Sequence, residues 1–406
     1  MNKELIITFS LYGIGGAQRR AFSLANQFAE NGYLVYIVAV LGDDKTINNE
    51  NYYYTHPNVN IIIIPEYYQK HRFDALTIKS DKHIEEHLKY LKKVQHIVQP
   101  FKKALEKINY RIKAVKTTND LRSFFMSHQD ALIINFGFNI FDKVFFSAKG
   151  LGFKIIYSET NASNKYSSDR YCEQTKKTIK KADALIFQTT EEKAEHGITK
   201  SKKAFVIHNP IKSDLPQSYN KSRNKTIVNF CRLSRQKNLL LLIKAFEKLL
   251  VDYPDYKLKI YADTADSKNT EYKEELISYI ATNKLENSVF ILPPSPDIHS
   301  IILDCAMFVS SSDYEGISNS MIEAMAIGLP CVCTDCGGGG AREMINDGEN
   351  GLLVPVGDAD ALKNAMVRMI TEKDLAEKCS KNAAKIRETH SIEKISEKWL
   401  EVINNI

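Results

Sequence analysis

Short apolar runs rich in β-branched residues alternate along the chain with longer segments in which apolar positions recur every three or four residues. In the first half these runs are Leu5–Phe9, Leu34–Val40, Val59–Ile64, Ala131–Phe136, Lys154–Tyr157, Ala184–Phe187 and Ala204–Ile207. In the second half they are Thr226–Cys231, Lys257–Tyr261, Ser288–Leu292, Met307–Ser310, Cys331–Cys333 and Leu352–Val354. This alternation predicts an α/β protein with parallel strands joined by crossover helices.

The helical segments show the complementary periodicity. Between the first two apolar runs, Ala21, Leu24 and Phe28 follow helical spacing. They predict a helix from about Ala17 to Asn31, ended by Gly32.

A polar segment divides the two halves. Residues 209–225 carry Asn, Pro, Ser and Lys with little periodicity, as is typical of a linker. We expect an N-terminal domain over 1–208, this linker, a C-terminal domain over 226–390, and a helix over 391–406 that crosses back to the first domain. Since the halves share one architecture, we expect two doubly wound, Rossmann-like domains facing a central cleft, with ligands at the carboxyl ends of the strands.

Length and composition agree with two globular domains. The chain has 406 residues, of which 44% are hydrophobic and 26% charged. A net charge of +6 is modest for this length and argues against a nucleic-acid partner. The sequence has no run of about 18 apolar residues, and no cleavage-site pattern follows Leu5–Phe9. We therefore expect a cytoplasmic location.

The seven cysteines are irregularly spaced, which does not predict a disulfide framework. Cys331, Cys333 and Cys336 include one C-x-x-C, but no second pair completes the four ligands of a structural zinc site. We expect buried, reduced thiols.

The segment Ser-Asp-Tyr-Glu-Gly-Ile-Ser-Asn-Ser follows a predicted strand and opens a helix, for which Ser318 or Asn319 suits the N-cap. Backbone N–H groups from Gly316 through Ile317 to Ser320 can face an anion at the positive end of that helix.

Two carboxylates, Glu315 and Glu323, accompany this helix and can accept hydrogen bonds from sugar hydroxyls. In the alternative interpretation they are solvated charges at the helix ends. Two cations, Arg232 and Lys237, follow the first strand of the second half. They could neutralise a departing diphosphate, or they could be ordinary solvated loop residues.

A glycine-rich turn follows the first strand. Gly15 and Gly16 would let the backbone approach a donor phosphate or an acceptor closely. The turn is not the dinucleotide fingerprint, because Gln18 stands in place of the third glycine.

Together these motifs resemble the family 4 retaining glycosyltransferases, which have the GT-B fold. The resemblance is carried by Glu-x7-Glu with Ala-Met-Ala-x-Gly-x-Pro at 315–330, by its continuation through Gly338 and Glu343 to Val354, by Arg-Leu-x-x-x-Lys at 232–237, and by Gly-Gly-Ala-Gln-Arg at 15–19. It implies that Glu315 contacts the donor sugar and Glu323 the nucleotide ribose.

The chain departs from the family pattern at several positions. Cys231 and Asn238 replace glycines, and Leu292-Pro293-Pro294 stands where a glycine is common. A histidine that many relatives carry after the strand ending at Glu159 is replaced by Thr160-Asn161, so the histidine's role is not transferred.

The resemblance implies a retaining hexosyl- or N-acetylhexosaminyl-transferase of the bacterial polysaccharide or lipid-linked glycan type. It would move a sugar from a nucleotide-sugar donor, with UDP as the expected nucleotide, to a hydroxyl of a glycan or lipid-linked glycan. The expected catalytic residues are Arg232, Lys237 and Glu315. The expected donor-binding residues are Gly15, Gly16, Gly316, Ile317, Ser318, Asn319 and Glu323.

No cofactor or metal is expected, because protein groups meet the diphosphate charge. Asp358-Ala359-Asp360 matches the D-x-D pattern of metal-dependent transferases, but it precedes a predicted helix, where an Asp is an ordinary cap. The alternatives are a GT-B sugar-nucleotide epimerase, a nicotinamide-dependent Rossmann oxidoreductase and an inactive sugar-binding subunit. The missing third glycine argues against the oxidoreductase, and the intact charged motifs argue against the inactive subunit.

A basic stretch from Lys89 to Lys116 contains a single acid, Glu106, and interleaves lysines with apolar residues. It predicts a helix pair that docks on the first domain, or peripheral attachment to an anionic surface at the inner face of the plasma membrane. The two interpretations are compatible.

Overall fold

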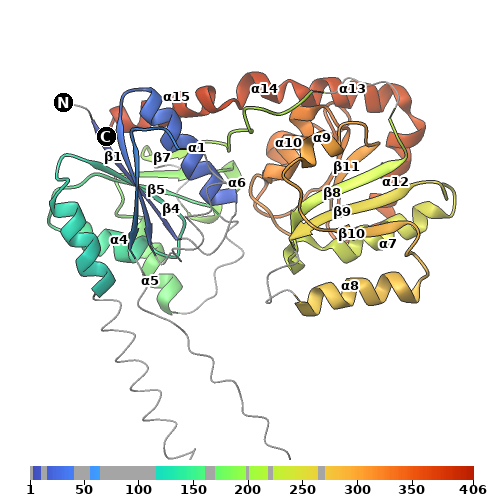
Figure 1. The fold of residues 1–406 in the computed structure, drawn as a ribbon, viewed down its shortest axis with the longest axis horizontal. Coiled ribbons are helices and arrows are strands. Elements are labelled where there is room, and N and C mark those ends of the chain that lie inside the picture. Colours follow the sequence, from blue (N-terminus) through green and yellow to red (C-terminus); the bar gives the residue numbers. More distant parts are fainter. Residues whose placement is uncertain are drawn as a thin grey trace, which may run out of the picture. The chain divides into compact units, whose positions relative to one another are not determined.

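The chain forms two parallel β-sheets flanked by helices (Figure 1). This computed structural model describes residues 3–10, 16–40, 55–64, 116–160, 170–197, 201–217, 223–263 and 270–406. By its internal contacts the chain divides into two compact units, Met1–Ile155 and Ile156–Ile406. The predicted α/β class is confirmed, whereas the predicted domain limits at 208, 225 and 390 stay a prediction.

Among its described residues, the first unit holds four parallel strands. They are β1 (Glu4–Ser10), β2 (Leu34–Val40), β3 (Val59–Ile64) and β4 (Leu132–Phe136). β1 lies between β2 and β4, and Leu5 faces both Val35 and Leu132. The helices are α1 (Gly16–Glu30), α4 (Phe141–Ala148) and a segment over 116–126. Strands buried on both faces read as continuous apolar runs, which is why their positions could be predicted.

The sheet order is β3-β2-β1-β4-β5-β6-β7. The last three strands are β5 (Ile155–Ser158), β6 (Ala184–Phe187) and β7 (Ala204–Val206), with helices α5 (Arg170–Ile179) and α6 (Thr190–Glu195) between them. Thr189 caps α6 by accepting a hydrogen bond from the Glu192 amide. This cap places Glu191 and Glu192 in the first helical turn.

The second sheet has the order β10-β9-β8-β11-β12-β13. Its strands are β8 (Thr226–Arg232), β9 (Lys257–Asp263), β10 (Val289–Leu292), β11 (Met307–Ser310), β12 (Cys331–Thr334) and β13 (Leu352–Val354). The order reverses between β8 and β11, so the loops after these two strands leave the sheet side by side. In doubly wound sheets, ligands bind at this switch point.

Helices cover both faces of the second sheet. One apolar cluster joins Ile227 and Met307 to α7 (Leu239–Leu250), and it also includes residues of α8 (Thr270–Thr282) and α12 (Ala359–Thr371). The other joins Val228 and Phe308 to α10 (Asn319–Ile327), with residues of α9 (Ile298–Ile301), α11 (Gly340–Met344) and α14 (Ile386–Thr389). Neighbouring strand residues point to opposite faces, so each strand supplies both clusters.

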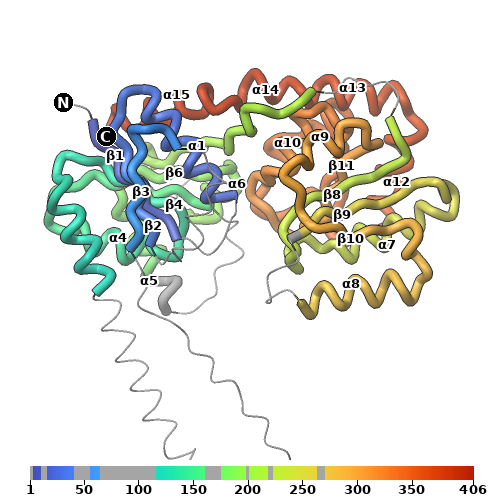
Figure 2. The backbone as a smooth tube through the Cα atoms, viewed as in Figure 1, coloured from blue at the N-terminus to red at the C-terminus, as the bar shows by residue number. Residues whose placement is uncertain are grey.

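The remaining helices, α13 (Lys373–Ala384) and α15 (Ile392–Asn404), precede and follow α14, and Figure 2 shows the three in succession. The Ser391 side chain caps α15 by accepting from the Lys394 amide. The predicted start near Ser391 is confirmed, and the predicted crossing to the first domain stays a prediction.

The structure shows the surroundings of two motifs that the sequence analysis considered as metal sites. Cys331 and Cys333 are buried on the α10 face of β12, and burial raises the pKa of both thiols, so the expectation of buried thiols is confirmed. Asp358 is the N-cap of α12, accepting from the Ala361 amide at 2.8 Å, while Asp360 pairs with Lys248. Both aspartates therefore serve the helix, as expected.

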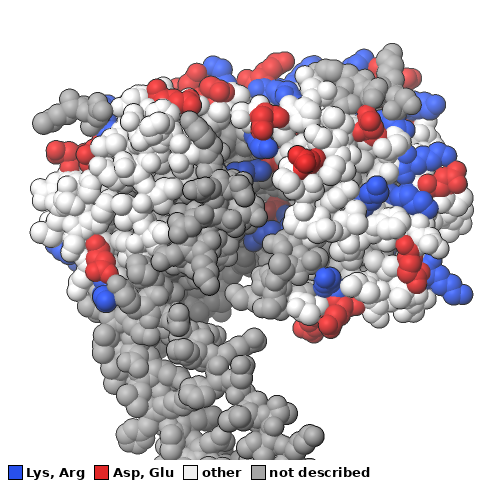
Figure 3. Space-filling model, in the orientation of Figure 1, with Lys and Arg blue, Asp and Glu red and all other residues white. Residues whose placement is uncertain are grey.

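Charges of both signs are interspersed over the described surface drawn in Figure 3. Within the part of the chain that the structure describes, no helix is long and apolar enough to cross a membrane. The predictions for Gly15, Asn161 and the basic stretch up to residue 115 lie outside the described residues.

Candidate active site

The loops that follow β8 and β11 are tied together at the switch point. The Ser311 hydroxyl donates to the carbonyl oxygens of Lys237 and Asn238, both at 3.0 Å. The Asp313 amide donates to the Gln236 carbonyl at 2.9 Å. The two motifs, 78 positions apart in the sequence, thus form one rigid surface.

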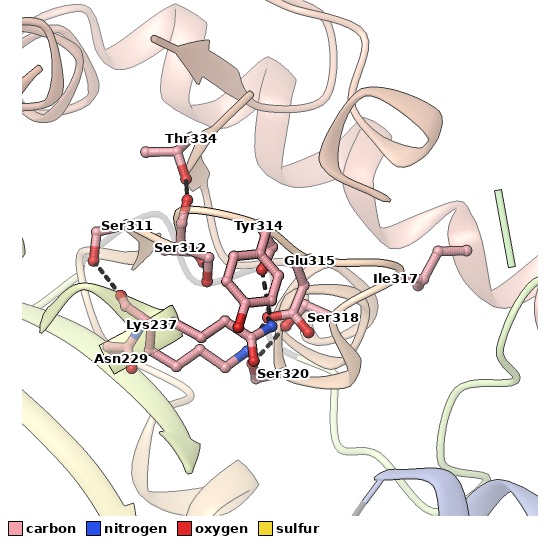
Figure 4. A network of polar contacts seen from close by, with 12 residues as sticks. Asn229, Lys237, Ser311, Ser312, Tyr314, Glu315, Ile317, Ser318, Ser320 and Thr334 are labelled. Carbon is pink, nitrogen blue, oxygen red and sulfur yellow. Dashed lines mark hydrogen bonds and ion pairs between the residues drawn. The ribbon is translucent and has the colours of Figure 1, made fainter. Parts of the chain in front are cut away.

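An ion pair lies at the centre of this surface. The Lys237 ammonium donates to Glu315 Oε2, and Figure 4 shows the two side chains pointing toward each other. The Lys237 side chain is 10% exposed and that of Glu315 19%. Burial disfavours the ammonium, yet the adjacent carboxylate holds the pKa of Lys237 above its ordinary value. Lys237 is therefore charged at neutral pH, and the pair is largely shielded from water.

Neighbouring groups fix the orientation of Glu315. The Gln236 amide donates to the Tyr314 carbonyl at 2.8 Å and lies 3.4 Å from Glu315 Oε2. Arg232, at the end of β8, is exposed, and its positive charge opposes that of Lys237. Two cations at one strand end make the site attractive to an anion.

Asn238 explains one departure from the family pattern. It has φ 41° and ψ 50°, in the left-handed region, and its side chain accepts from the Leu241 amide to cap α7. This backbone conformation favours glycine and tolerates asparagine. Asn238 thus keeps the conformation expected of a glycine and adds a cap.

The start of α10 presents its positive end beside this ion pair. Ser318 is the N-cap, as one of the two predicted positions, but its side chain does not cap the helix and instead lies 3.0 Å from the Ser320 hydroxyl. The preceding Ile317 is buried. Because the cap does not occupy the first-turn amides, this end can receive an anion.

Glu323 lies about one turn into α10 and is buried. Its Oε2 accepts from His299 Nε2, on α9, at 2.8 Å. The His299 ring also meets Phe230 edge-on. The sequence analysis missed His299, because a lone histidine in a short apolar segment carries no recognisable signal.

A second polar group lies at the carboxyl ends of β5 and β6. Glu159 is buried and accepts from the Tyr157 hydroxyl at 2.6 Å and the Thr160 amide at 2.7 Å. His196 Nε2 lies 3.4 Å from the same carboxylate. The position where relatives carry a histidine is therefore held in place by Glu159, which the sequence analysis also missed.

The structure thus brings Lys237 and Glu315 together, with Gly316, Ile317, Ser318 and Asn319 continuing from them into α10. Gly16 is exposed at the start of α1. No group of three His, Cys, Asp or Glu side chains that could hold a metal ion occurs among the described residues.

The fold is that of known solved structures. Over 99% of this chain and 100% of the other, it resembles the crystal structure of HepE from Anabaena in complex with UDP-glucose, with a TM-score of 0.74 and 15% sequence identity. Two parallel sheets flanked by helices, matching this structure over nearly the whole chain, confirm the predicted α/β fold of the GT-B type.

Sequence comparison finds a related family. Residues 211–386 match the family model of the glycosyl transferases group 1. The chain is 25% identical to poly(glycerol-phosphate) alpha-glucosyltransferase of Bacillus subtilis over 257 residues, 62% of this chain and 37% of the relative.

A second relative comes from Campylobacter jejuni. It is N-acetylgalactosamine-N,N'-diacetylbacillosaminyl-diphospho-undecaprenol 4-alpha-N-acetylgalactosaminyltransferase, 34% identical over 165 residues, 41% of this chain and 42% of the relative. The matches span less than half the length of these two relatives. The resemblance to family 4 glycosyltransferases that the motifs indicated is confirmed.

Proposed function

We propose that this protein is a retaining glycosyltransferase that moves a sugar from a UDP-sugar to a hydroxyl of a glycan or lipid-linked glycan. The observation that carries the proposal is the shielded Lys237–Glu315 pair beside the positive end of α10. A cation for phosphate and an acceptor for sugar hydroxyls thus stand side by side. The names of the relatives support the acceptor class, and the UDP-glucose complex of HepE supports the donor.

In the proposed reaction the bond between the sugar C1 and the diphosphate breaks while C1 bonds to the acceptor oxygen on the same face. The acceptor proton passes to the departing phosphate oxygen. Lys237 and Arg232 stabilise the negative charge that develops there, together with the α10 amides. Glu315 holds the donor sugar, and Glu323, oriented by His299, holds the ribose. The protein contributes positioning and electrostatic stabilisation.

The test is an assay of UDP release with a set of UDP-sugars, with and without undecaprenyl-diphosphate-linked glycan, in buffer and in EDTA. We expect UDP to appear only with acceptor, and the anomeric configuration of the donor to be kept in the product. Since Arg232, Lys237 and amides meet the diphosphate charge, EDTA should leave the rate unchanged. UDP release without acceptor would favour the epimerase, and loss of activity restored by Mg²⁺ would contradict the metal-free scheme.

We further propose peripheral attachment to anionic membrane through the basic stretch at 89–116, since each basic residue near such a surface contributes about 1 kcal/mol. Wild-type protein should co-sediment with vesicles that contain anionic lipid at low salt and dissociate at high salt. Replacing Lys92, Lys93, Lys102 and Lys103 by Gln should weaken binding. A wild type that stays in the supernatant at low salt would contradict this proposal.

A further inference from the structure

The start of α6 holds the loops that carry the proposed donor site. Thr189 Oγ1 donates to the Gly338 carbonyl at 2.7 Å. The Gly338 amide in turn donates to Glu191 Oε1 at 3.2 Å, and Arg342 Nη1 donates to Glu191 Oε2 at 2.9 Å. Both backbone polar groups of Gly338 are therefore bound by neighbouring residues of one helix start. We call residues 188–192 the α6 clasp.

Backbone hydrogen bonds connect the glycine loop bound by the clasp to Glu315. The Glu315 amide donates to the Gly337 carbonyl at 2.8 Å, and the Gly340 amide lies 3.4 Å from the Glu315 carbonyl. The backbone on both sides of the Glu315 side chain is thus tied to the glycine loop at 337–340, and that loop is tied to Glu191. Hydrogen bonds thus connect the clasp, through the glycine loop, to the backbone of Glu315.

The fit leaves no room for side chains. A Cβ on Gly316 would lie 2.5 Å from Glu192 Oε1, and a Cβ on Gly339 would lie 2.8 Å from Glu191 Oε2. Gly339 also has φ +71°, which favours glycine. The backbone at both positions passes so close to the clasp that glycine is favoured there.

A second tie comes from the segment that follows β7. Asn209 is buried, and its side-chain amide lies within 3.2 Å of Gln188 Oε1, the Ile317 carbonyl and Asn319 Oδ1. It joins the clasp to the first residues of α10. Gln188 and Asn209 lie outside the motifs that the sequence analysis proposed to bind the donor.

Resting on the proposed function, we infer that Glu191 is a positioning residue: through the glycine loop it holds Glu315 in the geometry that selects the donor sugar. Glu191 is suited to this role because its carboxylate accepts from a backbone amide and a guanidinium together, which is stronger than a neutral hydrogen bond. It does not touch the donor in this scheme. Its loss should therefore affect recognition of the sugar more than binding of UDP.

The experiment compares Glu191→Ala with Glu195→Ala, a matched control on an exposed position of the same helix. Hydrogen exchange of the peptide around 335–344 is measured first, without ligand. Glu191→Ala should lower protection of the Gly338 amide about tenfold, the effect of losing one hydrogen bond to a charged group. The control should exchange like the wild type. Unchanged protection in Glu191→Ala would overturn the clasp.

Calorimetry then gives the ratio of UDP-sugar affinity to UDP affinity. Glu191→Ala should lower this ratio relative to the wild type on the order of tenfold, in the same direction as Glu315→Ala. The affinity for UDP itself should stay unchanged. Glu191→Gln keeps an acceptor for the Gly338 amide and should therefore restore part of the lost ratio. An unchanged ratio despite faster exchange would overturn the positioning role. A wild type that binds no nucleotide sugar would refute the proposed function and with it donor positioning, while the exchange measurement still decides whether the clasp holds the loop.

Discussion

At the residue scale, the two cations of the site differ in their surroundings. Lys237 is buried and paired with Glu315, whereas Arg232 is exposed at the end of its strand. Removing one partner of a shielded ion pair leaves the other charge without compensation. The two cations should therefore contribute differently to stability, although both are assigned to the leaving group.

We predict that Lys237→Ala and Arg232→Ala each lower kcat on the order of 10²-fold, because both charges act on the departing diphosphate. Lys237→Ala should also lower the free energy of unfolding by about 1–3 kcal/mol, while Arg232→Ala should leave it unchanged. Steady-state kinetics and urea unfolding measure the two effects. Near-wild-type turnover in either variant would refute the leaving-group assignment.

At the scale of elements, two loops meet backbone to backbone. A Cβ added to Gly340, at the start of α11, would collide with the Gly316 carbonyl, just before α10. The approach fixes the distance between the glycine loop and the donor-binding end of α10. Backbone atoms cannot move aside as a flexible side chain could, so this glycine is a constraint on the site.

Gly340→Ala should therefore weaken UDP-sugar binding by more than tenfold, because the loop at 316–319 must shift. Gly357→Ala is the control: its Cβ would meet nothing within 4 Å, although its φ of +77° is unfavourable for alanine. The control should lose about 1 kcal/mol of stability and keep donor affinity. Equal affinities in the two variants, measured by calorimetry, would count against the constraint.

At the scale of the whole molecule, a histidine pair fastens residues 208–211 to the region after α14. His208 Nδ1 lies 2.9 Å from His390 Nε2, with the rings stacked, and the Ile211 amide donates to the His390 carbonyl at 2.8 Å. Burial lowers the pKa of His208. Burial, with repulsion from Lys398 and from His208 once it is protonated, lowers the pKa of His390 to about 4. Both histidines are neutral in the folded protein at pH 7.

Stability should fall in acid for this reason. A histidine with a lowered pKa stabilises the fold fully above its unfolded pKa of 6.5, and this contribution is lost as the pH falls toward about 4. The full contribution of His390 is on the order of 3 kcal/mol, at about 1.4 kcal/mol per pKa unit for a shift from 6.5 to about 4. Urea unfolding from pH 7 to 4.5 should show a shallower decline in His390→Gln than in the wild type. Parallel declines would show that this pair does not set the dependence.

Much of the fold was determined by the sequence alone. The bounds of β3, β6, β11 and β13 agree with the predicted runs, because strands buried on both faces need unbroken apolar sequence. The starts of α10 and α15 lie where the sequence predicted them, with Ser318 and Ser391 as the N-cap residues. The pattern of charged residues likewise placed Lys237 and Glu315 at strand ends. In each case the signal lies within a few neighbouring residues.

Only the tertiary structure decided which distant groups meet. The pairing of Glu323 with His299, the binding of Gly338 by Thr189 and Glu191, and the contact of His208 with His390 join residues from 24 to 182 positions apart. Such pairs leave no periodic trace, because one polar residue looks the same in sequence whether it faces water or a partner. Each parallel sheet brings the loops that follow its strands to its own carboxyl edge. Which polar residues meet is then decided by their distance in the folded chain.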